Sequence, residues 1–340
     1  MATPTLKSIA KATGFSVTTV SRALGGYDDV NEDTRRIILE EAQRQGYEPN
    51  FIARQLQGRR TYTIGMVIPA SVRSTLDDFF SVLIKGVSYS AAKHHYDLLI
   101  SAQIHGTNEM DAYRRIVGGN RVDGVIVART YQIDPRIDYL KTINHPFVVS
   151  GRSAPDKESD FPYIDVDSRA GIRMLVQHFV EYGHEHIGLI LPPAEIAYTP
   201  YRLAGYQDGL AAVGIPFRTE YTVNSDLMYQ GGCDATTELL ERAPQISALI
   251  ACNDLMALGA MSAIRERGLQ VGEDIAVGGF DNIPAAEHAN LTTVSQPIYQ
   301  IGEQLTDKLL RLIAGDVLED YGTLLIPELV IRESSGHPRR

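Results

Sequence analysis

Two groups of polar side chains have the types and spacing that binding chemistry needs. Short hydroxyls and one arginine lie on one face of a helical pattern near the N-terminus, at Thr18, Thr19, Ser21 and Arg22. Such side chains suit hydrogen bonds to DNA phosphates and to base edges. A second group lies further along the chain: Arg129, Arg152, Asn253 and Asp281 stand at or beside the ends of apolar runs, and Arg202 opens a helical pattern after one. Planar side chains of these types can hydrogen-bond the hydroxyl groups of a sugar.

Three short helices are predicted to position the first group. The expected N-caps are Thr5, Ser16 and Asn31, and the expected ends are Gly14, Gly25 and Gly46. The third helix should bury Ile37, Ile38 and Ala42. Two short helices joined by a tight turn, with a third packed across them, indicate a helix-turn-helix. A small helical bundle with a solvated polar face is the alternative.

A further helical pattern, residues 51–57, follows this head and ends at Gly58. It is too short to be stable alone in water, and it leaves Leu56 without an obvious core beside Arg54. These features favour a helix that folds on DNA and inserts its leucine into the minor groove, where such wedges kink a base step. A plain linker helix is the alternative.

Charge is distributed unevenly along the 340 residues. The net charge is −10, yet residues 1–60 hold nine basic and seven acidic side chains, so the acidic excess lies in the remainder. A basic head on an acidic body indicates that only the head meets a polyanion. The basic surplus is small, so affinity for DNA should also need dimerisation or specific base contacts.

The sequence carries no signal for export or for a membrane. No apolar run reaches the roughly 18 residues of a membrane span, and the N-terminus lacks the apolar segment of a signal peptide. Two cysteines, Cys233 and Cys252, do not make a disulfide framework in a chain of this length. We therefore expect a cytoplasmic protein with no membrane partner.

Strands and helices are predicted to alternate in two series through the body. The expected strands are 63–69, 98–104, 124–129 and 147–152, then 187–192, 221–223, 247–253 and 275–281. The expected helices are 78–94, 108–118, 169–182, 201–212, 231–242 and 254–267. This alternation predicts two doubly wound parallel-sheet lobes. Their strand ends, and any ligand, should meet in the cleft between the lobes.

Signals for catalysis and for metal binding are weak. His184 and His186 are two residues apart just before a strand, which is poor ligand spacing. The glycine-rich segments form neither a dinucleotide fingerprint nor a phosphate loop. No nucleophile–base pattern stands out. We expect no enzyme, no metal and no cofactor.

The first sixty residues resemble the lactose-repressor (LacI) family in register, through TLKSIAKATGFSVTTVSRAL and RRIILEEAQRQGYEPNFIARQLQGRRTYTIG. The resemblance implies that Val17, Thr18 and Arg22 read bases. It places Thr5, Ser16, Thr19 and Ser21 on phosphates, and Ala53 and Leu56 in the centre of a palindromic operator. Val17 is small and apolar where some relatives carry a large polar residue, so it suits a thymine methyl group and leaves the operator sequence open.

The resemblance continues through the body, at GHEHIGLILP, YRLAGYQDGL, SALIACNDLMALGAMSAIRERGLQVGEDIAVGGFDN and LTTVSQP. It implies a type I periplasmic-binding-protein fold with chain crossings near 162, 292 and 323. The expected domains are a head at 1–48, a hinge at 49–60, a first lobe at 61–162 and 292–323, and a second lobe at 163–291 and 324–340. The last strand, 324–334, should return to the second lobe.

By the same resemblance, the residues that bind an effector are Arg202, Asp281, Asn253, Arg152, Asp78, Phe79 and Arg129, although the family counterpart of Arg129 varies. Structural alternatives stand beside several of these assignments. Arg152 could form an ion pair between the lobes, and Phe79 could belong to the core. Asp254, next to Asn253, is expected to be a helix N-cap.

The function expected is that of a homodimeric repressor that binds double-stranded operator DNA and is released by a small sugar. The chain ends without the leucine heptads that make some family members tetramers, so we expect a dimer. A corepressor-dependent regulator with a purine-like effector is the main alternative. A solute-binding protein is the next, and the head argues against it.

Overall fold

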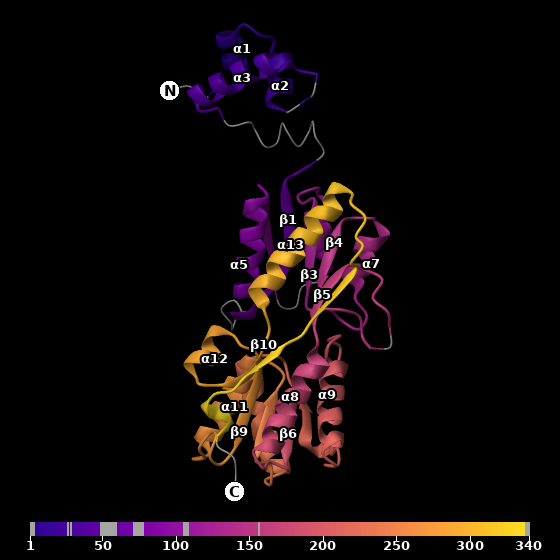
Figure 1. Ribbon diagram of the computed structural model, residues 1–340, viewed down its shortest axis with the longest axis vertical. Helices are drawn as coiled ribbons and strands as arrows, with labels where there is room; N and C mark the ends of the chain where they lie inside the picture. The colour runs from indigo at the N-terminus through magenta and orange to yellow at the C-terminus, as the bar shows by residue number, and fades with distance from the viewer. Residues whose placement is uncertain are drawn as a thin grey trace. The chain divides into compact units, whose positions relative to one another are not determined.

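The computed structural model describes residues 4–25, 27, 29–47, 60–70, 78–104, 109–155 and 157–336 (Figure 1). The chain forms two compact units that divide between Thr61 and Tyr62. None of the helices in the described residues is both long enough and apolar enough to cross a membrane. The predicted hinge falls mostly on residues 48–59, which lie outside the described part of the chain.

The head consists of three helices, α1 (Leu6–Thr13), α2 (Val17–Leu24) and α3 (Glu32–Gln45). The predicted caps are confirmed: the side chains of Thr5, Ser16 and Asn31 each accept a hydrogen bond from a backbone N–H in the first turn. Gly14 and Gly46 end α1 and α3 in the left-handed conformation, at φ 77° and 64°, which glycine adopts without strain.

A small apolar core joins the three helices of the head. It contains Ile9, Ala10, Val20, Ala23, Val30, Ile38 and Ala42. The prediction that Ile37 is buried was wrong, because 43% of its surface is exposed. The helical period places Ile38 and Ala42, four residues apart, on the inner face, so the neighbouring Ile37 points outward.

The first lobe of the larger unit is built on a six-stranded parallel sheet. Its strands are β1 (Thr63–Ala70), β2 (Asp97–Ile104), β3 (Gly124–Ala128), β4 (Phe147–Ser150), β5 (Tyr163–Val166) and β11 (Gly322–Leu325). They lie in the order β11-β5-β4-β3-β1-β2. The helices of this lobe are α5 (Asp78–Lys93), α6 (Glu109–Tyr113), α7 (Pro135–Thr142) and α13 (Ile298–Ala314), with a π-helical turn at Arg114–Gly118.

The second lobe repeats the plan. Its strands are β6 (Ile187–Leu191), β7 (Thr222–Asn224), β8 (Ala248–Ala251), β9 (Ala276–Asp281), β10 (Thr292–Ser295) and β12 (Glu328–Val330). Their order is β12-β10-β9-β8-β6-β7, and β12 runs antiparallel to β10. The helices are α8 (Ser168–Glu181), α9 (Thr199–Ala212), α10 (Tyr229–Arg242), α11 (Asp254–Glu266) and α12 (Pro284–His288). The predicted fold class is therefore confirmed.

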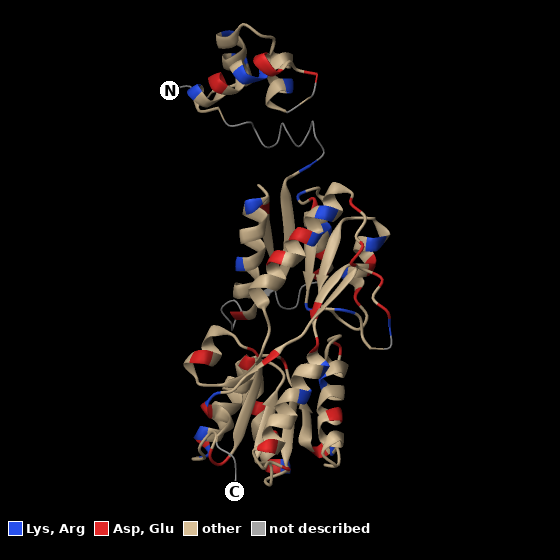
Figure 2. Cartoon of the chain, in the orientation of Figure 1, with Lys and Arg blue, Asp and Glu red and all other residues tan. Residues whose placement is uncertain are grey.

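Burial on both faces explains the composition of the central strands. β1, β3, β4, β6 and β8 carry no charged residue, whereas the helices and loops carry most of the charge (Figure 2). Near-continuous apolar runs are typical of parallel strands covered by helices on both sides. Two carboxylates interrupt this rule, Asp165 within β5 and Asp281 at the end of β9.

The three predicted crossings between the lobes need correction by two to four residues. The chain leaves the first sheet after β5, not at 162, because Tyr163 and Ile164 pair with β4. It leaves the second sheet after β10, not at 292, since Thr292–Ser295 pairs with β9. It returns after β11, not at 323, because Leu324 and Leu325 still pair with β5. The predicted strand 324–334 is thus divided between the two sheets.

Candidate functional site

The outer face of α2 is the surface that the sequence assigned to DNA. Val17 and Thr18 are exposed, and Arg22 is exposed one turn further along the helix, while Val20 and Ala23 are buried on the opposite face. The helix is therefore anchored by its apolar side and presents a small apolar group, a hydroxyl and a guanidinium outward. This combination can meet both phosphates and base edges.

Arg22 forms an ion pair within the head. Its Nη2 lies 2.5 Å from Asp29 Oδ2, and its guanidinium lies 4.8 Å from the centre of the Tyr27 ring. Both charged side chains are about half exposed, so the pair is screened by water and can be exchanged for a phosphate or a base.

The other predicted DNA contacts in the head have local structural roles as well. Thr5 and Ser16 cap their helices, and the Ser16 hydroxyl lies 2.8 Å from that of Thr19. Ser21 is half-buried. A hydroxyl that caps a helix N-terminus lies beside unpaired backbone N–H groups, where a phosphate also binds well. Ala53 and Leu56 lie outside the described residues, so their assignment stays a prediction.

The larger unit contains a cavity of about 70 Å³ where the two sheets meet at the ends of their strands. Its lining comes from both lobes and consists of Phe79, Phe80, Arg129, Ser150, Gly151, Asp165, Ser168, Tyr198, Arg202, Leu227, Asn253, Asp281 and Gln296. The cavity is thus at the edge where parallel sheets of this kind bind ligands.

Arg202 is the most distinctive group in the cavity. It is 4% exposed, and its guanidinium lies between two aromatic rings, 3.9 Å from the centre of Phe280 and 4.3 Å from that of Tyr198. Nε and Nη1 have no hydrogen-bond partner among the described residues. A buried charged group is normally paired or hydrogen-bonded. Arg202 therefore carries two buried donors without a partner among the described residues.

Asp281 and Asn253 of the second lobe line the same cavity. Asp281 ends β9 with φ 122°, a strained conformation for a residue with a side chain, and its Oδ1 accepts a hydrogen bond from Gln296. Asn253 caps α11: its Oδ1 accepts from Met256 N at 2.9 Å, and its Nδ2 donates to Leu227 O at 2.9 Å. The amide of Asn253 and the carboxylate of Asp281 are thus fixed in the lining of the cavity that Arg202 shares.

The first lobe contributes a carboxylate with an unusual pKa. Burial raises the pKa of Asp165 to about 6, although Arg152, 3.0 Å away, acts in the opposite direction. The guanidinium of Arg152 in turn lies 4.0 Å from the centre of the Tyr201 ring, which belongs to α9 of the second lobe. The alternative for Arg152, an ion pair between the lobes, is not what forms: the pair with Asp165 lies within the first lobe, and the contact with the Tyr201 ring reaches the second.

Models of two known protein families match the parts of the chain that carry these two sites. The model for bacterial regulatory proteins, lacI family, matches residues 5–50, and that for a periplasmic binding protein-like domain matches residues 176–335. The chain is 32% identical to the HTH-type transcriptional regulator CelR of Thermobifida fusca over 97% of its own length and 98% of the relative's. It is 31% identical to the HTH-type transcriptional repressor CytR of Escherichia coli (strain K12), over 97% and 96%.

Two solved structures are similar to this chain over nearly its whole length. A CelR–cellobiose complex is 30% identical, with a TM-score of 0.76 over 97% of this chain and 99% of that one. The lac repressor dimer bound to operator and the anti-inducer ONPF is 27% identical, with a TM-score of 0.82 over 98% and 100%. The chain belongs to the LacI family of bacterial regulatory proteins.

Most of the effector residues predicted for this LacI-family regulator lie together. Arg202, Asp281, Asn253, Phe79 and Arg129 line the cavity. Two predicted residues do not line it: Asp78 at the start of α5, and Arg152, which lies behind Asp165. Asp254 is not the N-cap of α11, because Asn253 occupies that position and Asp254 is the first helical residue. Its buried carboxylate accepts from Ile283 N and from the Thr293 hydroxyl.

Several lining residues of this regulator were not predicted from the sequence. These are Phe80, Ser150, Gly151, Asp165, Ser168, Tyr198, Leu227 and Gln296. Only Asp165 carried a usable signal, since a carboxylate in the middle of a strand that is otherwise apolar needs a special reason. The others are ordinary residue types in helices, strand ends and loops, and only the fold brings them together.

The two histidines that could have suggested a metal have other partners. His184 Nδ1 lies 2.9 Å from the Ser247 hydroxyl, and His186 Nδ1 lies 2.9 Å from the Tyr221 hydroxyl. Among the described residues, no group of three or more histidine, cysteine or acidic side chains could hold a metal ion.

The pKa of Asp165 predicts a pH effect on this LacI-family protein. Because the folded pKa of about 6 exceeds the unfolded value of about 3.9, the folded state keeps the proton longer, and stability falls as pH rises from about 4 to 6. At about 1.4 kcal/mol per pKa unit, Asp165 lowers the free energy of unfolding by up to about 3 kcal/mol over this pH range. This decrease should be absent in Asp165→Asn, because an amide does not titrate. Urea unfolding of both proteins at several pH values measures it.

Asp208→Asn is the control for that experiment. The hydrogen bond from Arg169 lowers the pKa of Asp208, so wild-type stability from this group is lost as pH falls, the opposite sign. Equal pH slopes for wild type and Asp165→Asn would contradict the prediction.

Proposed function

We propose that this protein is a sequence-specific transcriptional repressor that binds a palindromic operator as a dimer and is released by a small sugar in the cavity. The observation that carries the effector half is Arg202, a buried guanidinium with two unused donors beside fixed amide and carboxylate groups. The observation that supports the DNA half is α2, whose exposed face carries Val17, Thr18 and Arg22.

Relatives support both halves. A structure of the relative CelR is a complex with cellobiose, and the lac repressor structure is a dimer on its operator. A repressor acts where the chromosome is, so we place this protein in the cytoplasm. A role as a regulator rather than an enzyme fits the absence of a nucleophile–base pattern in the sequence.

The size of the cavity suggests how a sugar acts. Small-molecule sites usually measure about 300–1,000 Å³, several times the 70 Å³ of this cavity. A sugar therefore requires a different arrangement of the lobes or of the lining side chains. It shifts the equilibrium between the two arrangements only by the difference in its affinity for them. The arrangement with sugar bound is the one that releases operator DNA in this proposal.

The decisive experiment combines two measurements on the full-length protein. Thermal unfolding is recorded with a panel of mono- and disaccharides, since a ligand at a hundred times its Kd stabilises the fold by about 2.7 kcal/mol. Each hit is then titrated into a gel-shift assay with DNA from upstream of the protein's own gene. Loss of the shifted band supports the proposal, and failure to shift that DNA with and without sugars contradicts it.

The same titration separates the alternatives. A ligand that strengthens the shift identifies a corepressor, and purines belong in the panel for that reason. Sugar binding without any DNA shift indicates a solute-binding protein, and turnover of the bound sugar indicates an enzyme. Sedimentation analysis tests the dimer.

A substitution on α2 tests the DNA surface. Arg22→Ala should weaken operator binding about 10- to 100-fold, because a bidentate base contact contributes about 1–3 kcal/mol. Arg36→Ala is the matched control, since Arg36 is also exposed and paired with an acid, Asp33, but lies on α3. Fluorescence anisotropy with labelled operator gives both values. Equal effects of the two substitutions would indicate general charge attraction and contradict a role in base reading.

A further inference from the structure

The loop after β3, residues 129–134, belongs both to the cavity and to the contact between the lobes. Arg129 lines the cavity, with its guanidinium 5.2 Å from the centre of the Phe80 ring. The next residues hydrogen-bond the second lobe: Ala197 N donates to Thr130 O at 2.9 Å, and Gln132 N donates to Glu195 O at 2.8 Å. One short loop therefore joins the ligand site to the second lobe.

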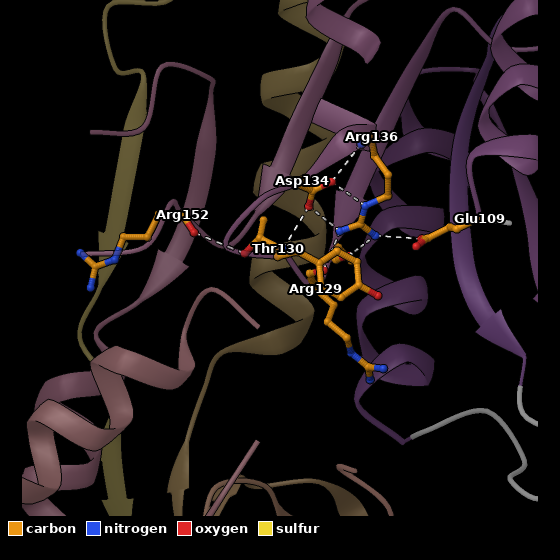
Figure 3. Close-up of polar contacts among 8 residues, drawn as sticks. Glu109, Arg129, Thr130, Asp134, Arg136 and Arg152 are labelled. Atoms are coloured by element: carbon orange, nitrogen blue, oxygen red, sulfur yellow. Dashed lines mark hydrogen bonds and ion pairs between the residues drawn. The ribbon is translucent and has the colours of Figure 1, made fainter. Parts of the chain in front are cut away.

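Arg136, the second residue of α7, holds this loop from behind. It is 3% exposed. Its Nη2 donates to Arg129 O at 2.7 Å and its Nη1 to Ala128 O at 3.3 Å. Two carboxylates balance its charge, Asp134 at 2.7 Å and Glu109 at 2.9 Å (Figure 3). A planar guanidinium can serve four acceptors in this way, whereas a lysine ammonium cannot.

Asp134 closes the other end of the loop. Its Oδ1 caps α7 by accepting from Arg136 N at 3.1 Å, and its Oδ2 accepts from Tyr131 N at 3.1 Å. The guanidinium of Arg136 also lies 4.7 Å from the centre of the Tyr131 ring. Arg136 and Asp134 together therefore fix the backbone at both ends of the segment that meets the second lobe.

The backbone of Arg129 shows why such support is needed. Its φ of 56° is left-handed, a conformation that a residue with a side chain keeps only where its surroundings fix it. The hydrogen bond from Arg136 falls on the carbonyl of this same residue. The side chain of Arg129 points away from Arg136 (Figure 3), and its guanidinium lies over Phe80 at the cavity.

We infer that Arg136 is a positioning residue for effector recognition: with Asp134 and Glu109 it holds the 129–134 loop so that Arg129 reaches the cavity and residues 130–132 pair with the second lobe. This inference rests on the proposed function for its ligand, but the position of the loop can be tested without one.

The test without ligand is hydrogen exchange in full-length Arg136→Lys. The Gln132 and Ala197 amides donate to the opposite lobe, so their exchange should accelerate about tenfold or more when the loop loosens. Glu109→Gln keeps both carbonyl hydrogen bonds of Arg136 and should give a smaller acceleration at the same amides. If Arg136→Lys does not fold, Glu109→Gln carries the test.

Leu140→Ala is the matched control. Leu140 is fully buried on α7 but does not belong to the loop, so this variant destabilises the same helix by loss of packing. At comparable overall stability it should leave exchange of Gln132 and Ala197 at the wild-type rate. Equal acceleration in Leu140→Ala, or unchanged exchange in both the Arg136→Lys and Glu109→Gln variants, would overturn the inference.

The ligand arm uses a sugar that stabilises the wild-type protein in the panel. Its Kd, from calorimetry, should rise about tenfold in Arg136→Lys, a change of about 1.4 kcal/mol, while operator affinity without sugar stays unchanged. An unchanged Kd for sugar would also count against Arg136 as a positioning residue. If no sugar binds the wild type, the proposed effector fails, and the exchange measurements still decide the role of Arg136.

Discussion

Arg202→Met should abolish the response to sugar and leave operator binding intact. Two charge-assisted hydrogen bonds from Nε and Nη1 would be lost, each contributing about 1.5–3 kcal/mol, so the Kd for sugar should rise at least about a hundredfold. Methionine can occupy the space between Phe280 and Tyr198. The result would be a repressor that no longer leaves its operator, measured by calorimetry with sugar and by gel shift with and without it.

The unliganded stability of this variant gives an independent check. Arg202 is a buried charge whose Nε and Nη1 lack partners among the described residues, so its replacement by an apolar side chain should not lower the melting temperature. Arg169→Met is the control, because Arg169 is an exposed arginine of the same lobe that pairs with Asp208. Sugar affinity of Arg202→Met within tenfold of the wild type would refute the assigned role.

Gly86→Ala should cost about 1–3 kcal/mol or more of unfolding free energy. Helices α5 and α13 approach each other closely at a pair of glycines: a Cβ on Gly86 would lie 2.0 Å from Tyr299 O, and one on Gly302 would lie 2.5 Å from Leu83 O. Backbone atoms cannot rotate away, so the helices must move apart, and overpacking of this kind costs about 1–3 kcal/mol or more. Urea unfolding measures the loss.

Gly118→Ala provides the comparison within the same lobe. A Cβ there would have its nearest neighbour at 3.8 Å, an ordinary contact, so the change should be close to neutral. Because α5 begins beside the cavity, with Phe79 and Phe80 in its first turn, Gly86→Ala should weaken sugar binding as well. Unfolding energies that match for the two variants would show that the helices have room to adjust.

The sequence predicted elements well where local rules decide them. Thr5, Ser16 and Asn31 cap helices as expected, because capping depends on a side chain and the backbone two or three residues away. The predicted crossing points between the lobes were wrong, because pairing with a neighbouring strand determines where each strand ends. The ends of β5, β10 and β11 depend on pairing with strands far along the chain, which no local pattern contains.

The residues of the candidate site were also predicted only in part. Asn253 and Asp281 stand at the ends of apolar runs, and Arg202 lies in the first turn of the helix after β6; all three line the cavity, while their contact with an effector stays a prediction. Gln296 and Leu227 reach the cavity from loops with no distinguishing composition. Arg136 looks like an ordinary helix arginine in the sequence, and its burial depends on Glu109 from another helix.

The three crossings between the lobes restrict how this molecule can move. A single connection would let one lobe spin or slide freely against the other. Three connections, after β5, β10 and β11, join the lobes. Rotation of one lobe about any one connection would stretch the others. We therefore expect the lobes to move mainly by opening and closing, so that binding in the cavity changes one angle between them.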